Sequence, residues 1–149
     1  LEKIIKIVTV SKISIKYALA KFYLIDFALK GYKNPINKFV KKFSGNFLFK
    51  EIVKDIKKIK KFKSKFDPIT LKKLGMACSY PGTFNSSIYT IINSKNYKDA
   101  ILKTIKAGGC NCSRANFVGA YFASLKGINS IPKSWIKKTI PAKKILNQK

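Results

Sequence analysis

Two closely spaced cysteines lie between a pair of glycines and an arginine in the stretch AGGCNCSRAN, residues 107–116. Cysteine thiolates can ligate soft metals, whereas the unpaired backbone N–H groups at a helix start attract anions. Asn111, Ser113 and Arg114 would add hydrogen-bond donors to such a turn. The stretch therefore indicates a cysteine site or a phosphate-binding turn, although a Gly-Gly pair between helices is also an ordinary way to build a tight corner.

The rest of the composition argues against a cysteine site. Cys78, Cys110 and Cys112 are an odd number of thiols, and the chain has no histidine to complete a set of zinc ligands. A redox pair normally has two residues between its cysteines, and free cysteine is often simply buried. We therefore expect packed or incidental thiols in a reduced, cytoplasmic setting.

Carboxylates are few and scattered. The chain of 149 residues contains six acidic side chains, and no two of them lie one or two positions apart. No local carboxylate pair is therefore available to bind a metal ion or to act on a glycosidic bond.

The net charge of +26 comes almost entirely from lysine, because Arg114 is the only arginine. Dense positive charge attracts nucleic acid by counterion release, but nucleic-acid-binding proteins commonly use arginine for bidentate contacts. We therefore expect a solvated lysine surface that binds nucleic acid non-specifically and only at low salt. No apolar run approaches the roughly 20 residues of a membrane helix, so no membrane partner is expected.

The hydrophobic periodicity is helical throughout, and no alternating run or hairpin turn indicates a strand. Pro-Gly turn chemistry predicts a loop at residues 78–82, and the tail from residue 141 is rich in lysine. Helices are predicted at residues 2–10, 13–30, 35–42, 47–62, 68–74, 83–93, 97–107 and 111–126, with a short one after Pro132. The fold class is therefore all-α, a helical bundle spanning residues 1–140, followed by a loose basic tail at 141–149.

Local signals fix several of these helix ends. Asn34, Asp67 and Asn96 are good N-cap residues, and Gly31 follows a helix where a left-handed C-cap is needed. The helix at 111–126 is expected to be central, because its small residues allow close approach. Predicted core positions of the other helices are Tyr17, Ala20, Leu24, Phe27, Ala28, Ile52, Val53, Ile56, Ile59, Phe84, Ile88, Ile91 or Ile92, Ala100, Ile101, Thr104 and Ile105.

Residues 79–139 resemble the C-terminal part of the ADP-ribosylglycohydrolase family. The resemblance rests on ordered landmarks: a Pro-Gly loop, two helices, the Gly-Gly turn, a helix of small residues and the ending GINSIPKSWI. The wording SYPG and NCSRANFVGA looks most like the lens J-crystallin branch of that family. Weaker similarity extends upstream through residues 1–78, so residues 1–140 are identified as the C-terminal part of one such domain, and the fold that the resemblance implies is an all-α bundle.

The resemblance implies a hydrolase of the glycosidic bond of ADP-ribose that uses magnesium ions held by carboxylates. The family's two aspartates after the Gly-Gly pair fall on Cys110 and Cys112, and thiols are poor ligands for magnesium. The family's other ligands belong to an N-terminal half with a Gly-Asp-Ala motif and an Asp-Asp pair, neither of which occurs here. We therefore expect no catalytic residue, no metal site and no cofactor in this chain, and we expect the missing N-terminal half of the domain as its partner.

Four functional interpretations follow. The first is a catalytically impaired ADP-ribosylglycohydrolase-like domain that still binds ADP-ribose or a related nucleotide. The others are a structural, crystallin-like protein, a weak nucleic-acid binder, and an active hydrolase whose metal site comes from elsewhere. In the first interpretation Arg114 either contacts the ligand or braces the helix start. Its candidate ligand-binding residues are Tyr80, Gly82, Gly108, Gly109, Asn111, Ser113 and Arg114.

Overall fold

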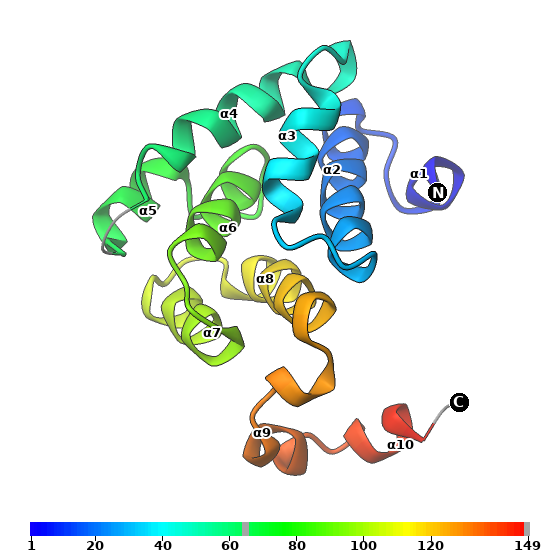
Figure 1. Cartoon of the computed structure of the whole chain (residues 1–149), viewed down its shortest axis with the longest axis vertical. Helices are drawn as coiled ribbons and strands as arrows, with labels where there is room; N and C mark the ends of the chain where they lie inside the picture. Colours follow the sequence, from blue (N-terminus) through cyan, green and yellow to red (C-terminus); the bar gives the residue numbers. More distant parts are fainter. Residues whose placement is uncertain (64–65, 148–149) are drawn as a thin grey trace.

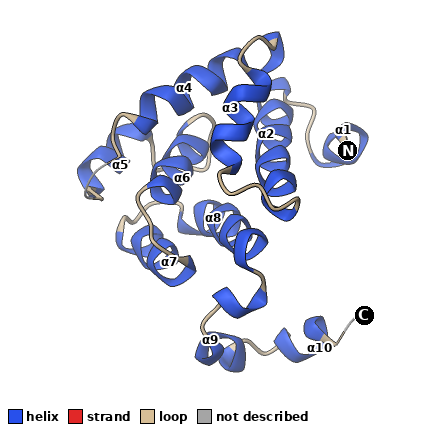
Figure 2. Ribbon diagram, viewed as in Figure 1, coloured by secondary structure: helices blue, strands red, loops and turns tan. Residues whose placement is uncertain are grey.

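The computed structural model describes residues 1–63 and 66–147, and within these ranges the regular structure is helical, with no strand (Figure 2). The elements are α1 (Glu2–Val8), α2 (Lys12–Leu29), α3 (Pro35–Phe43), η1 (Phe47–Phe49), α4 (Lys50–Lys60), α5 (Pro68–Leu74), α6 (Gly82–Ile92), α7 (Tyr97–Lys106), α8 (Asn111–Lys126), η2 (Ile128–Ser130), α9 (Lys133–Lys138) and α10 (Ala142–Leu146). The predicted all-α class is confirmed.

The predicted caps form as expected. The side chain of Asn34 accepts a hydrogen bond from the Asn37 amide, and that of Asp67 accepts from the Ile69 and Thr70 amides. Asn96 accepts from the Asp99 amide, and Gly31 adopts a φ of 77° after α2. These ends are local, so the sequence alone places them within a residue or two.

Helices α2, α3, α4, α6, α7 and α8 surround one hydrophobic core, while α9 and α10 extend away from it (Figure 1). Helix α8 packs against α2, α6 and α7, as its predicted central position requires. Helix α6 is more enclosed than α8, because eight of its 11 residues are buried.

Helix α6 is buried although its sequence contains several polar side chains. Ser86, Ser87 and Thr90 are buried, and each hydroxyl donates to the carbonyl four residues earlier, at 2.6–2.9 Å. These local bonds satisfy the hydroxyls inside the core, so residues that look polar in the sequence occupy apolar surroundings.

The core prediction is confirmed for most positions and wrong for one. The predicted positions on α2 and α4 are all buried, as are Ala100 and Thr104 on α7. Ile105 was expected to face inward, but 54 % of its surface is exposed. Helix α7 packs mainly against α8 and α6, and Tyr97 at its start also meets Trp135 of α9, so Ile105 lies at the open edge of the apolar stripe.

The lysine-rich tail contains a helix that the sequence did not predict. Ala142, Ile145 and Leu146 of α10 line an apolar groove together with Trp135 of α9. Residues 148–149 of the predicted tail lie outside the described residues. In the part of the chain that the structure describes, no helix has the length and hydropathy of a membrane span.

Candidate functional site

The Gly108–Gly109 turn joins α7 to α8, and both glycines have a left-handed backbone, with φ of 75° and 65°. The segment after α5 packs on this turn, because the Cys110 amide donates to the Met76 carbonyl at 2.9 Å. A Cβ atom built on Gly109 would lie 2.8 Å from both the Cβ and the carbonyl oxygen of Met76. Glycine is therefore required at 109 by its conformation and by the close approach of Met76.

We expect the Gly109→Ala variant to lose about 2–3 kcal/mol of unfolding free energy, because the new methyl group meets backbone as well as an unfavourable φ. Gly31→Ala tests the φ cost alone, since no atom lies within 4 Å of the place that its new methyl group would occupy, and it should lose about 1 kcal/mol. Gly45→Ala has neither problem and should be nearly neutral. Urea unfolding of the three variants measures the series, and equal losses at Gly109 and Gly31 would contradict the role of Met76.

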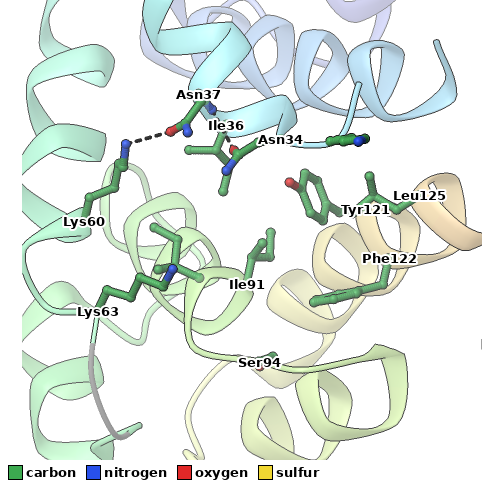
Figure 3. Close-up of a pocket in the computed structure, with 12 residues that line it drawn as sticks. Asn34, Ile36, Asn37, Lys60, Lys63, Ile91, Ser94, Tyr121, Phe122 and Leu125 are labelled. Carbon is green, nitrogen blue, oxygen red and sulfur yellow. Dashed lines mark hydrogen bonds between the residues drawn. The ribbon is translucent and has the colours of Figure 1, made fainter. Parts of the chain in front are cut away.

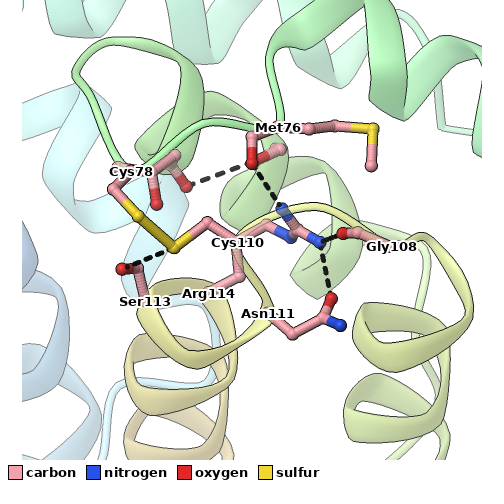
Figure 4. Close-up of a disulfide and its surroundings, with 9 residues drawn as sticks. Met76, Cys78, Gly108, Cys110, Asn111, Ser113 and Arg114 are labelled. Carbon is pink, nitrogen blue, oxygen red and sulfur yellow. Dashed lines mark hydrogen bonds between the residues drawn. A yellow bond between two sulfur atoms is a disulfide. The ribbon is translucent and has the colours of Figure 1, made fainter.

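Arg114 is turned into the protein and not toward solvent. It is 0 % exposed, and its guanidinium donates to the carbonyls of Met76, Thr104 and Gly108 and to the Asn111 side chain (Figure 4). Burial lowers the pKa of this guanidinium. Arg114 therefore ties the end of α7 and the segment after α5 to the start of α8. These contacts fit the interpretation in which Arg114 braces the start of α8 and does not contact a ligand. They also occupy the side-chain oxygen of Asn111.

The cysteines correct the expectation of unpaired thiols. Cys78 and Cys110 form a disulfide, with their Cα atoms 5.6 Å apart and a separation of 32 positions in sequence (Figure 4). The Ser113 hydroxyl lies 3.1 Å from the Cys110 sulfur and is the donor, because a disulfide sulfur carries no proton. Cys112 remains a free, exposed thiol.

The residues at this turn do not fit a magnesium ion. The Cys110 sulfur is bonded to Cys78, and Cys112 offers a thiol in place of a carboxylate oxygen. Among the described residues, no group of three or more His, Cys, Asp and Glu side chains is arranged to hold a metal ion.

The loop before α6 brings Tyr80 against α2. The Tyr80 ring stacks on that of Tyr17, with centroids 4.8 Å apart, and the Lys21 ammonium lies 5.0 Å from the Tyr80 ring centre and 5.3 Å from that of Phe117. Burial lowers the pKa of Lys21 and raises that of Tyr80. Burial, followed by the charges of Asp55 and Glu51, raises the pKa of Tyr17 to about 12. A cation and three aromatic rings thus gather at one place.

Gly82 has a packing role in this loop. A Cβ atom built on it would lie 3.1 Å from the Cα atom of Gly75, at the end of α5. The Gly75 and Gly82 backbones therefore approach each other more closely than side chains allow.

A groove of about 390 Å³ lies between α2, the loop at 78–82 and the first turns of α6 and α8; we call it the Lys21–Tyr80 groove. The Thr83 hydroxyl has no hydrogen-bond partner among the described residues, although Thr83 is only 2 % exposed. Cys110, the N-cap residue of α8, makes no side-chain capping hydrogen bond, so the positive end of the α8 dipole is available at this groove. The lining residues are Lys21, Cys78, Tyr80, Thr83, Cys112, Ser113 and Asn116.

The groove brings together only part of the set predicted from sequence. Tyr80 and Ser113 line it, whereas Gly82, Gly108, Gly109, Asn111 and Arg114 are outside its lining. Lys21 and Thr83 were missed, because no local pattern connects them to the Gly-Gly turn. Asn116 lies one helical turn after Ser113, and that spacing could have identified it.

The geometry suits a polar, anionic ligand: one cation, two hydroxyl groups, an amide and a helix start converge around an aromatic ring. Comparison with known proteins then decides the family, because the family model described as ADP-ribosylglycohydrolase matches residues 11–147. The chain belongs to the ADP-ribosylglycohydrolase family. Its all-α fold agrees with this membership.

Two curated relatives are crystallins of Tripedalia cystophora. Crystallin J1A is 38 % identical over 69 residues, which are 46 % of this chain and 21 % of that protein. Crystallin J1B is 30 % identical over 76 residues, 51 % of this chain and 24 % of that protein. The chain thus aligns with about a quarter or less of these ADP-ribosylglycohydrolase family members. No solved structure showed significant similarity to it.

Proposed function

We propose that the chain is the C-terminal part of an ADP-ribosylglycohydrolase-type domain that binds an ADP-ribose-like ligand in the Lys21–Tyr80 groove without hydrolysing it. The observation that carries this proposal is the chemistry of positions 110 and 112. Where the family resemblance expects magnesium-binding aspartates, this chain has a disulfide sulfur and a thiol. Neither is a ligand that magnesium prefers.

The placement of the carboxylates supports the loss of hydrolysis. Asp26 and Asp99 pair with the lysines one turn later on their helices, at 2.8 and 2.7 Å. Asp67 caps α5, and Asp55 accepts a hydrogen bond from Asn85 at 3.2 Å. These four carboxylates have structural partners, and none is among the residues that line the groove.

Retained binding is supported by the groove itself. Lys21 supplies a positive charge in partly buried surroundings, where attraction for a phosphate is less screened than at an open surface. The unpartnered Thr83 hydroxyl can gain a hydrogen bond from a ligand that it lacks in the free protein. Tyr80 offers a ring face for a sugar or base.

The partner in this proposal is the remainder of such a domain. Helix α1 has no buried residue, and its apolar side chains Ile4, Ile7 and Val8 are 66 %, 81 % and 83 % exposed. An amphipathic helix is normally covered on its apolar side. We propose that the N-terminal half of the domain covers α1.

Calorimetric titration with ADP-ribose, in the presence and absence of Mg²⁺, tests the proposed function. We expect the same binding heat under both conditions. An ADP-ribosylated peptide, incubated with the protein and Mg²⁺, should release no free ADP-ribose over hours. Lys21→Gln should weaken binding about tenfold, the effect of losing about 1.4 kcal/mol. Lys12→Gln is the matched control, since Lys12 is exposed on the same helix α2 and outside the groove, and it should change binding less than twofold.

Two results would overturn this proposal. Product release that depends on Mg²⁺ would show an active hydrolase, with ligands that come from elsewhere. A complete lack of heat would favour the second candidate, a structural protein, which the two crystallin relatives support. Binding of nucleic acid is proposed only as a low-salt consequence of the lysine surface, and it should vanish at physiological salt.

A further inference from the structure

Another groove lies between the start of α3, the end of α4, the end of α6 and the C-terminal half of α8 (Figure 3). Its volume is about 440 Å³, within the usual range for small-molecule sites. The lining residues are Lys33, Asn34, Ile36, Asn37, Lys60, Lys63, Ile91, Ile92, Ser94, Tyr121, Phe122 and Leu125.

The polar part of this groove is positively charged. Lys33, Lys60 and Lys63 come from two different segments of the chain and meet at one cavity. Within the described residues, no carboxylate lines it, so the three charges are not neutralised there. A cavity focuses such a field more strongly than a flat surface does. Lysines also line two further grooves of the protein, so charge alone does not set this groove apart.

Lys60 is held in position by a chain of hydrogen bonds. Its ammonium donates to the Asn37 side-chain oxygen at 2.6 Å. The backbone N–H of Asn37 in turn donates to the Asn34 side-chain oxygen at 2.9 Å. An ammonium group has three donors, so two remain for a ligand. A cation that is already ordered loses less side-chain entropy on binding than a free surface lysine.

The opposite wall is apolar and largely buried. Ile91 and Phe122 are 6 % and 8 % exposed, and Tyr121 beside them is 4 % exposed. Burial raises the pKa of the Tyr121 hydroxyl well above its ordinary range, and the smaller opposing effect of the Ile36 backbone does not cancel it, so Tyr121 stays neutral. The groove therefore offers cations on one side and a preformed apolar surface on the other.

We propose that this groove binds a small phosphorylated molecule that carries an apolar ring, with Lys33 and Lys60 on the phosphate and Phe122 and Ile91 against the ring. The site is independent of the Lys21–Tyr80 groove. The two linings share no residue, and Ser113 and Phe122 are separated by about 14 Å along α8 at 1.5 Å per residue.

Naphthyl phosphate is the probe, measured by isothermal titration calorimetry, with naphthol and inorganic phosphate in separate titrations. We expect naphthyl phosphate to bind at least tenfold more tightly than either part. The Lys33→Gln/Lys60→Gln variant should lose about tenfold or more in affinity. Lys72→Gln/Lys73→Gln on α5 removes the same charge outside the groove and should lose less than twofold. Ser94→Glu places a carboxylate in the lining and should abolish binding.

Each alternative outcome overturns the proposal. Equal losses in the two double variants would mean that the lysine surface as a whole attracts the probe. Naphthol binding as tightly as its phosphate would mean an apolar pocket only. Loss of affinity in Lys21→Gln, with none in Lys33→Gln/Lys60→Gln, would place the probe in the other groove. All variants are first checked for a cooperative unfolding transition, so that a folding defect is not mistaken for lost binding.

Discussion

Replacing Arg114 by methionine is expected to lower the free energy of unfolding by about 3–5 kcal/mol, because several buried acceptors lose their donor and each unpaired buried polar group costs about 1–3 kcal/mol. The guanidinium is fully buried and serves the carbonyls of Met76, Thr104 and Gly108 and the side chain of Asn111. Methionine has a similar length but no donor, so these acceptors would lose their partner inside the protein.

Two further variants make the Arg114 experiment specific. Lys126→Met removes a positive charge from the same helix at an exposed position and should cost less than about 0.5 kcal/mol. Arg114→Lys keeps the charge but replaces the planar guanidinium by an ammonium with three donors. Its loss of unfolding free energy should lie between those of the other two variants. Urea unfolding measures all three. If Arg114→Met is no less stable than Lys126→Met, the network does not hold the turn together.

Reduction of the Cys78–Cys110 disulfide is expected to cost about 3–4 kcal/mol of unfolding free energy in the chain-entropy model. That value follows from the 32-residue separation of the two cysteines, because a cross-link removes loop-closure entropy from the unfolded chain. Unfolding in urea with and without a thiol reductant measures it. The Cys78→Ser variant should be less stable by a similar amount and insensitive to the reductant.

Cys112→Ser is the matched control, since Cys112 is free and exposed two positions after Cys110. It should retain the sensitivity to reductant and change stability by less than about 0.5 kcal/mol. Thiol titration of the native protein should find one free thiol per chain. Three free thiols, together with stability that the reductant does not change, would show that the bond is not formed.

The disulfide also bears on the proposed ligand. Cys78 lines the Lys21–Tyr80 groove, and its bond to Cys110 ties the loop that carries Tyr80 to the start of α8, which carries Ser113. Both walls of the groove are thereby connected covalently. A preformed groove loses less conformational entropy when a ligand binds.

Most helix boundaries could be predicted from the sequence because their determinants are local. Asn34, Asp67 and Asn96 bond to amides two or three residues away, and Gly31 meets the φ requirement of its own position. Apolar spacing likewise predicts which face of α2 or α4 is buried. Apolar spacing does not predict how much of an apolar stripe the neighbouring helices cover. Ile105 is exposed because the neighbours of α7 do not reach the edge of its stripe.

The candidate site was predicted only in part because its members meet across long stretches of sequence. The sequence by itself determined the all-α class, the helix ends and the Gly-Gly turn with two cysteines directly after it. Only the tertiary structure decided that Cys110 pairs with Cys78, that Arg114 points inward, and that Lys21 and Thr83 join Ser113 in one groove. Helical periodicity and capping act within a few residues, whereas pairing and burial depend on how whole helices pack together.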